Sequence, residues 1–241
     1  SKEEEIVREL EKILRDHLRK VERIVEDLEK LLDDHLKKIE ELAKRLEEII
    51  REAARKLEEK GVDDKVIKKI RELLREIEEE LRKVLEDVRR LHKKLREELR
   101  RVVKRIRDLH KRILDELRKD TREDAIRRVL ELIKKVSREI LELVKRVLEA
   151  LRRISREVAK LLRRVLETIR RVLEEVVKEV EDEEVKELLK RVEKLIDDVR
   201  KKVEDLHREL EKALRDIDRK VKRLNEELER LVEEVEEKVK T

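Results

Sequence analysis

The apolar residues of the first 57 positions recur at a spacing of 18, as in the series Ile6, Ile24 and Leu42. Eighteen residues make about five turns of an α-helix at about 3.6 residues per turn. A heptad repeat would impose a left-handed supercoil and an 11-residue repeat a right-handed one, whereas this repeat requires neither. The spacing therefore predicts straight helices that pack in a nearly untwisted bundle.

The helical pattern is interrupted three times, at nearly equal intervals. Gly61 suits the left-handed position that ends a helix, and Asp63 can cap the next helix. Asp120 or Thr121 can cap a third helix, and Asp182 a fourth. Four helices of about 57 residues are predicted, at about 2–59, 64–119, 122–180 and 183–240. Because short connections make sequential helices antiparallel, residues 1–241 are predicted to form one all-α, up-down-up-down four-helix bundle.

The side-chain alphabet is narrow. The 241 residues include no Pro, Cys, Met, Trp, Tyr, Phe or Gln, one Gly and one Asn. Charged residues make up 57% of the chain, and Lys+Arg 71 are interspersed with Asp+Glu 66. Such a surface is typical of solvated, ion-paired helices. It offers neither a continuous basic face nor aromatic platforms, so we expect no nucleic-acid binding.

The same composition bears on location. No apolar run is long enough to span a membrane. The acidic N-terminus, Ser1–Glu5, does not resemble a signal or transit peptide. We therefore expect a soluble protein without a targeting signal, cytoplasmic if expressed recombinantly.

Eight polar residues interrupt the apolar stripe at repeat positions that elsewhere hold Leu or Ala. Within each predicted helix they lie 18 apart: His17 and His35, His92 and His110, Ser137 and Ser155, and His207 and Asn225. Distances from the predicted turns assign them to two levels, one with His17, His110, Ser137 and Asn225, the other with His35, His92, Ser155 and His207. A third level is apolar and contains Ala53, Leu74, Leu173 and Leu189.

Buried imidazoles need hydrogen-bond partners, because a neutral ring has one donor and one acceptor nitrogen. Leaving one of them unpaired costs about 1–3 kcal/mol. Ser and Asn side chains both donate and accept, so they can complete a network with His. We expect the layers to set helix pairing and register, because an exact apolar repeat otherwise permits sliding by one repeat.

A metal site is the alternative reading of the same residues. His35, His92 and His207 could supply three imidazoles to Zn, Ni or Cu, with water as the fourth ligand. No inward carboxylate stands behind them, and only His207 has a Glu three residues earlier, Glu204. Two axial His could also hold a haem, but no consistent set of small residues clears space for one. We expect no cofactor.

Catalysis is not expected, although Ser and His together resemble a nucleophile and its base. No third orienting group, oxyanion donor or substrate pocket is visible in the sequence. A pH response stays open as a further alternative. Burial lowers the pKa of a histidine, so protonation at low pH would then oppose folding.

The predicted helix 122–180 has the widest apolar arc. Its flank adds Ala125, Leu132, Leu143, Ala150 and Leu161. This flank either packs beneath neighbouring side chains or forms a weak self-association surface, since long exposed apolar strips associate. We expect a monomer that requires no partner, with weak self-association through this helix as the alternative.

Four features of the chain are shared with a known family of proteins: the narrow set of side chains, the exact repeat, the loop Gly61–Asp64 and the polar layers. The chain resembles de novo, parametrically designed helical bundles with buried hydrogen-bond networks, over all 241 residues. The resemblance implies a very stable, soluble scaffold without a natural function. His-rich layers are less usual in that family than Asn, Gln or Ser layers, which keeps metal binding and a pH response open.

Overall fold

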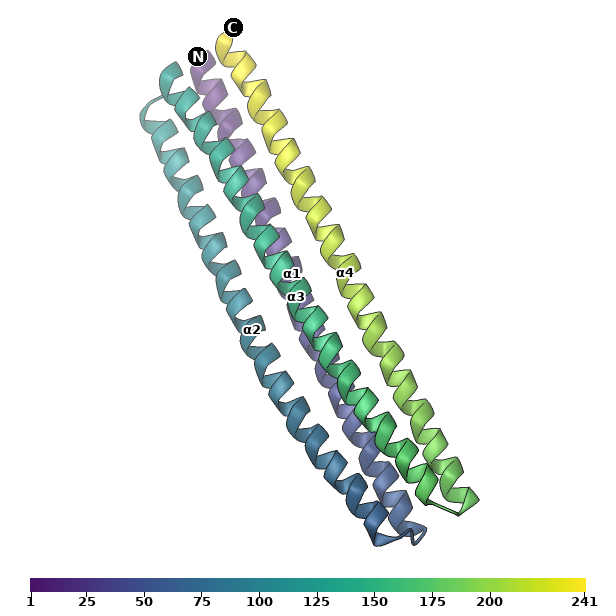
Figure 1. Ribbon diagram of the computed structural model, residues 1–241. Helices are drawn as coiled ribbons and strands as arrows, with labels where there is room; N and C mark the ends of the chain where they lie inside the picture. The colour runs from purple at the N-terminus through teal and green to yellow at the C-terminus, as the bar shows by residue number, and fades with distance from the viewer. The chain divides into compact units, whose positions relative to one another are not determined.

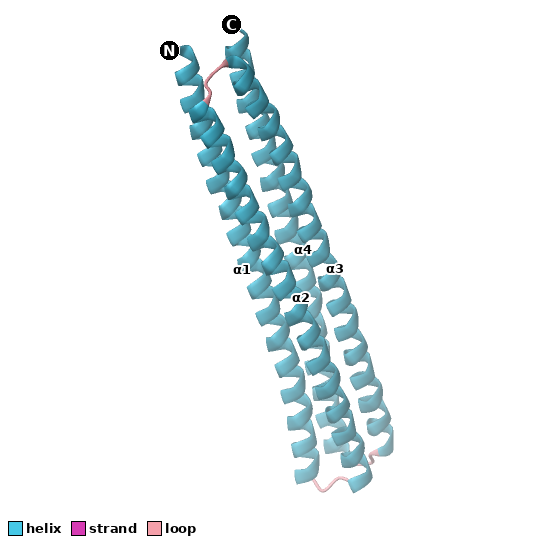
Figure 2. Ribbon diagram, turned by 90° about the vertical axis from the view of Figure 1, so that its left-hand side faces the viewer, coloured by secondary structure: helices cyan, strands magenta, loops and turns pink.

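The computed structural model describes all 241 residues and contains helices and no strand (Figures 1 and 2). The four helices are α1 (Lys2–Glu59), α2 (Asp64–Lys119), α3 (Glu123–Glu179) and α4 (Glu183–Lys240). The predicted all-α class and the number of helices are confirmed, and every predicted boundary lies within one residue of the observed one.

Contacts divide the chain into two compact units, and residues of all four helices contribute to each unit. Unit 1 contains residues 1–31, 93–151 and 212–241, and unit 2 contains residues 32–92 and 152–211. Each predicted polar level falls within one unit: the level of His17 and His110 in unit 1, and that of His35 and His92 in unit 2.

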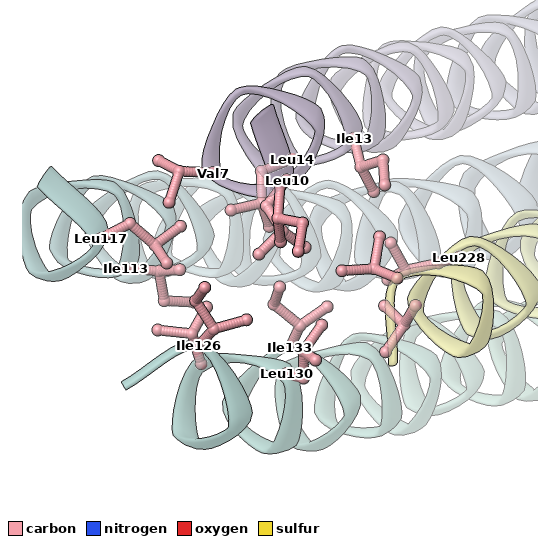
Figure 3. Packing of buried hydrophobic residues seen from close by; sticks show 14 residues of the cluster. Val7, Leu10, Ile13, Leu14, Ile113, Leu117, Ile126, Leu130, Ile133 and Leu228 are labelled. Atoms are coloured by element: carbon pink, nitrogen blue, oxygen red, sulfur yellow. The ribbon is translucent and has the colours of Figure 1, made fainter. Parts of the chain in front are cut away.

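The apolar stripes of all four helices meet in the core of unit 1. Leu10 of α1, Leu117 of α2, Leu130 of α3 and Leu228 of α4 all point into the space between the helices (Figure 3). Leu10 and Leu117 are completely buried. Burying such a side chain contributes about 1.5–3 kcal/mol, so side-chain packing is the main source of helix stability here.

Ion pairs between helices show which helices are neighbours. In unit 1 they join α1 to α4, α1 to α2, α2 to α3 and α3 to α4: Lys20–Glu227, Arg107–Glu22, Arg105–Glu139 and Lys134–Glu236. In unit 2 they join the same helices, in the same order: Lys38–Glu209, Arg89–Glu40, Lys69–Glu179 and Arg163–Glu204. Each exposed pair contributes only about 0–1 kcal/mol, so the pairs report helix order more than stability.

The first turn follows from its sequence. Gly61 has a φ of 70°, the left-handed conformation expected from its position. Its N–H donates to the Glu58 carbonyl (3.1 Å), and the Val62 N–H donates to the Leu57 carbonyl (3.3 Å). This is the Schellman arrangement, which satisfies the last carbonyls of a helix. Asp63 then caps α2, with its carboxylate accepting from the Lys65 N–H at 3.4 Å.

Two other helix starts are also capped by side chains, at Asp182 as predicted and at Ser1. The Asp182 carboxylate accepts from the Glu184 N–H at 2.9 Å and begins α4. The Ser1 hydroxyl accepts from the Glu4 N–H at 3.3 Å, and the Glu4 carboxylate reaches back to the Ser1 amino group at 3.7 Å. The reciprocal contacts correspond to a capping box.

The cap predicted for α3 was wrong. The first helical bond runs from the Ile126 N–H to the Arg122 carbonyl, so Arg122 is the capping position and neither Asp120 nor Thr121 is. The Asp120 carboxylate instead accepts from the Arg122 N–H at 3.0 Å and from its guanidinium at 2.8 Å. Because the guanidinium holds Asp120 in a local turn, α3 begins one residue later than predicted.

The wide apolar flank of α3 is only partly covered. Ala125 is buried and Leu143 and Ala150 are half-buried, whereas Leu132 and Leu161 are 40% and 38% exposed. Leu132 belongs to unit 1 and Leu161 to unit 2. None of the four helices combines the length and the apolar character needed to cross a membrane.

Candidate functional site: two polar layers

Seven of the eight polar residues singled out from the sequence are buried: His17, His35, His92, His110, Ser137, Ser155 and Asn225. The eighth, His207, keeps 20% of its side chain exposed. Each lies among Leu, Ile and Val side chains because the 18-residue repeat places it on the apolar face of its helix.

In unit 2 the structure brings His35 of α1 and His92 of α2 together. The His35 Nδ1 and the His92 Nε2 lie 3.2 Å apart, and the His92 Nδ1 lies 2.9 Å from the Val88 carbonyl. A carbonyl only accepts, so His92 carries its proton on Nδ1. The His92 Nε2 is then the acceptor, and the His35 Nδ1–H donates to it.

The other two residues of this layer also pair. The Ser155 hydroxyl of α3 lies 2.8 Å from the His207 Nδ1 of α4, and the His207 Nε2 lies 3.5 Å from the Glu211 carboxylate. A hydroxyl both donates and accepts, so the Ser155–His207 bond forms with either tautomer of the ring. The layer therefore forms two hydrogen-bonded pairs, one between α1 and α2 and one between α3 and α4.

The corresponding layer in unit 1 is arranged differently. The rings of His17 and His110 meet edge to face, with centroids 5.5 Å apart. Asn225 Nδ2 donates to the Ser137 backbone carbonyl at 3.3 Å, which joins α4 to α3. Five buried polar atoms have no hydrogen-bond partner: His17 Nδ1 and Nε2, His110 Nδ1, Ser137 Oγ and Asn225 Oδ1. The closed network expected at this level does not form.

Burial lowers the pKa of every histidine in these two pairs. The pKa of His17 falls to about 3 through desolvation and then through the neighbouring His110 and Lys20. The pKa of His35 also falls to about 3, through desolvation and then through the neighbouring His92. Desolvation lowers the pKa of His110 to about 4 and also lowers that of His92. All four rings are neutral at pH 7.

The three imidazoles considered as a metal site are engaged otherwise. His35 and His92 bond to each other, while His207 contacts Ser155 and Glu211. No group of three or more His, Cys, Asp or Glu side chains in the structure is arranged to hold a metal ion. His35, His92 and His207 are therefore not brought together as the ligand set that the sequence allowed.

Glu211 is the contact that sequence reasoning missed. Glu204, the acid noted near His207, pairs with Arg163 instead. The spacing of Glu211, four residues after His207 on one helix, is the feature that could have identified it. Ser155, His207 and Glu211 now follow the order of nucleophile, base and orienting acid. Ser155 itself is buried, with 2% of its surface exposed.

Comparisons with known proteins identify no relative of this chain. No family model, curated protein or solved structure matches the chain.

Proposed function

We propose that the chain is a designed structural scaffold in which the polar layers set helix pairing and register. The observation that carries the proposal is the layer in unit 2, where His35 bonds to His92 and Ser155 to His207. The narrow alphabet, the exact repeat and the lack of a matching family support a designed origin. The scaffold is proposed to be monomeric and non-catalytic, and to need no cofactor or partner.

The physical argument concerns competing arrangements. A helix could pair with its neighbour after sliding by one 18-residue repeat, about 27 Å along its axis. Such a shift could occur if a turn opened or if two chains exchanged hairpins. Most apolar contacts would be preserved by such a shift, since Leu, Ile and Val recur at each step. A histidine shifted into the apolar level would lose its partner, which costs about 1–3 kcal/mol for each unpaired group. The layers therefore favour one pairing over its alternatives.

The test replaces all eight layer residues with Leu. We expect this variant to keep its helicity and its resistance to denaturant, because apolar replacements preserve burial. We also expect it to show additional oligomers in analytical ultracentrifugation and duplicated amide resonances, whereas the parent shows one species. A variant with one species and one set of resonances would contradict the proposed role of the layers.

A matched control changes eight exposed positions of the same helices to Ala. These changes leave the layers and the core intact, so the control is expected to behave as the parent does. Extra species in the control would show that substitution in general, rather than loss of the layers, broadens the ensemble.

A further inference from the structure

An apolar cavity lies in the core of unit 1, between its four helices. Its lining consists only of Val, Ile and Leu side chains, and every helix contributes at least two of them. Val21 comes from α1, Ile106 from α2, Val144 from α3 and Val221 from α4. No polar surface borders the cavity, so it is separate from the polar layer of the same unit.

Two valines of the lining are shorter than their counterparts in other copies of the repeat. Eighteen positions after Val21 the repeat has Ile39. Eighteen positions before and after Val144 it has Ile126 and Leu162. Each of the two valines is one carbon shorter than these counterparts. Because packed helices relax only partly around a missing carbon, space remains beside both valines.

The cavity suits an apolar guest better than water. Inside it the centre of a water-sized sphere is free to move over about 10 Å³, which is room for about one small atom or molecule. A water molecule there would find no hydrogen-bond partner, and apolar cavities of this kind stay dry. The lining side chains lack neighbours on the cavity side, so an apolar guest supplies van der Waals contacts that are otherwise missing.

The cavity opens toward the seam between α2 and α3, which the Arg105–Glu139 ion pair bridges. Val102 of α2 and Leu143 of α3 are half-buried, whereas the other lining side chains are buried. Partly exposed side chains change rotamer within about nanoseconds. A guest can therefore enter past these two residues without separation of the helices.

We propose that the cavity is a binding site for one small, uncharged apolar atom or molecule, with xenon as the probe. Apolar core cavities in proteins take up such guests. The lining can pair with neither a charge nor a hydrogen-bonding group, so a polar ligand would lose its hydration without compensation. The scaffold role proposed above does not require this site, and the two proposals can fail independently.

The experiment records methyl NMR spectra of the unmodified protein under increasing xenon pressure. We expect the methyl resonances of Val21, Val144 and Ile106 to shift and to approach saturation. A Val21→Ile/Val144→Ile variant restores the longer side chains of the repeat and fills the cavity, so its Ile106 resonances should no longer shift. The matched control, Val7→Ile/Val136→Ile, makes the same change at buried positions of the same helices outside the lining and should keep the Ile106 shift.

Three results would contradict the proposal. The first is a set of lining methyl resonances that stay fixed under xenon. The second is an equal shift of the exposed Leu132 methyls, which would indicate adsorption to apolar surface in general. The third is an Ile106 shift that survives in the folded Val21→Ile/Val144→Ile variant. The spectra of the unmodified protein decide between the first two results and the proposal even if that variant does not fold.

Discussion

At the scale of residues, two histidine pairs on the same two helices differ in what their nitrogens contact. The His35 and His92 rings bond to each other and to the Val88 carbonyl. Both nitrogens of His17 and the Nδ1 of His110 lack partners in the protein. A hydrogen bond contributes little net stability when made, but an unpaired buried group carries its full desolvation cost. The two pairs should therefore respond to substitution in opposite directions.

Single substitutions test this difference. We expect His17→Leu to raise the free energy of unfolding by about 1–3 kcal/mol, because it removes unpaired polar atoms. We expect His35→Leu to lower it by about 1–3 kcal/mol, because the His92 Nε2 then loses its donor. Guanidinium unfolding of each variant and of the parent measures both changes. Shifts of the same sign would contradict the assigned hydrogen bonds.

At the scale of elements, helix boundaries depend on a few capping residues. Gly61, Asp63 and Asp182 act where the sequence predicted, because capping depends on backbone conformation and on neighbours within about four residues. The start of α3 departed from prediction because Arg122 bonds to Asp120, a local side-chain contact that competes with the cap. Local sequence thus predicts the starts of α1, α2 and α4 and misplaces the start of α3 by one residue.

The Gly61→Ala substitution tests the first turn. A Cβ at this position meets no atom within 4 Å, so the cost is conformational alone. Left-handed backbone costs an L-residue roughly 1–2 kcal/mol, and we expect a destabilisation of about 1 kcal/mol. Asn tolerates this conformation better, so Gly61→Asn should cost less. Equal losses for Ala and Asn in denaturant unfolding would argue against this explanation.

At the scale of the whole molecule, four buried histidines make stability depend on pH. Their folded-state pKa values lie below the unfolded value of about 6.5, two of them at about 3 and one at about 4. The unfolded chain therefore binds more protons than the folded chain as the pH falls below about 6.5. Stability is complete above this pH and is lost progressively as the pH falls toward the folded-state values.

The expected slope is about 1.4 kcal/mol per pH unit for each such histidine, within that window. Guanidinium unfolding at pH 7.5 and pH 5.0 measures it. A variant with Leu at His17, His35, His92 and His110 is the control, since all its carboxylates are retained. If the free energy of unfolding changed by the same amount between the two pH values in both proteins, the histidines would not link folding to pH.

The sequence by itself determined the helices, their order and the residues that interrupt the apolar stripe. These features follow from spacing along one helix and from turn chemistry, both of which are local. The repeat also assigned His17, His35 and their counterparts to two equivalent levels. The two levels differ in sequence only by Asn225 in one and His207 in the other, and the spacing that generates them is identical.

Only the tertiary structure decided which polar atoms meet. His35 reaches His92 within hydrogen-bond distance, whereas the rings of His17 and His110 meet edge to face without a bond. Glu211 rather than Glu204 contacts His207. A hydrogen bond is made or lost over a few tenths of an ångström. Such distances depend on packing across four helices, which no spacing along one helix specifies.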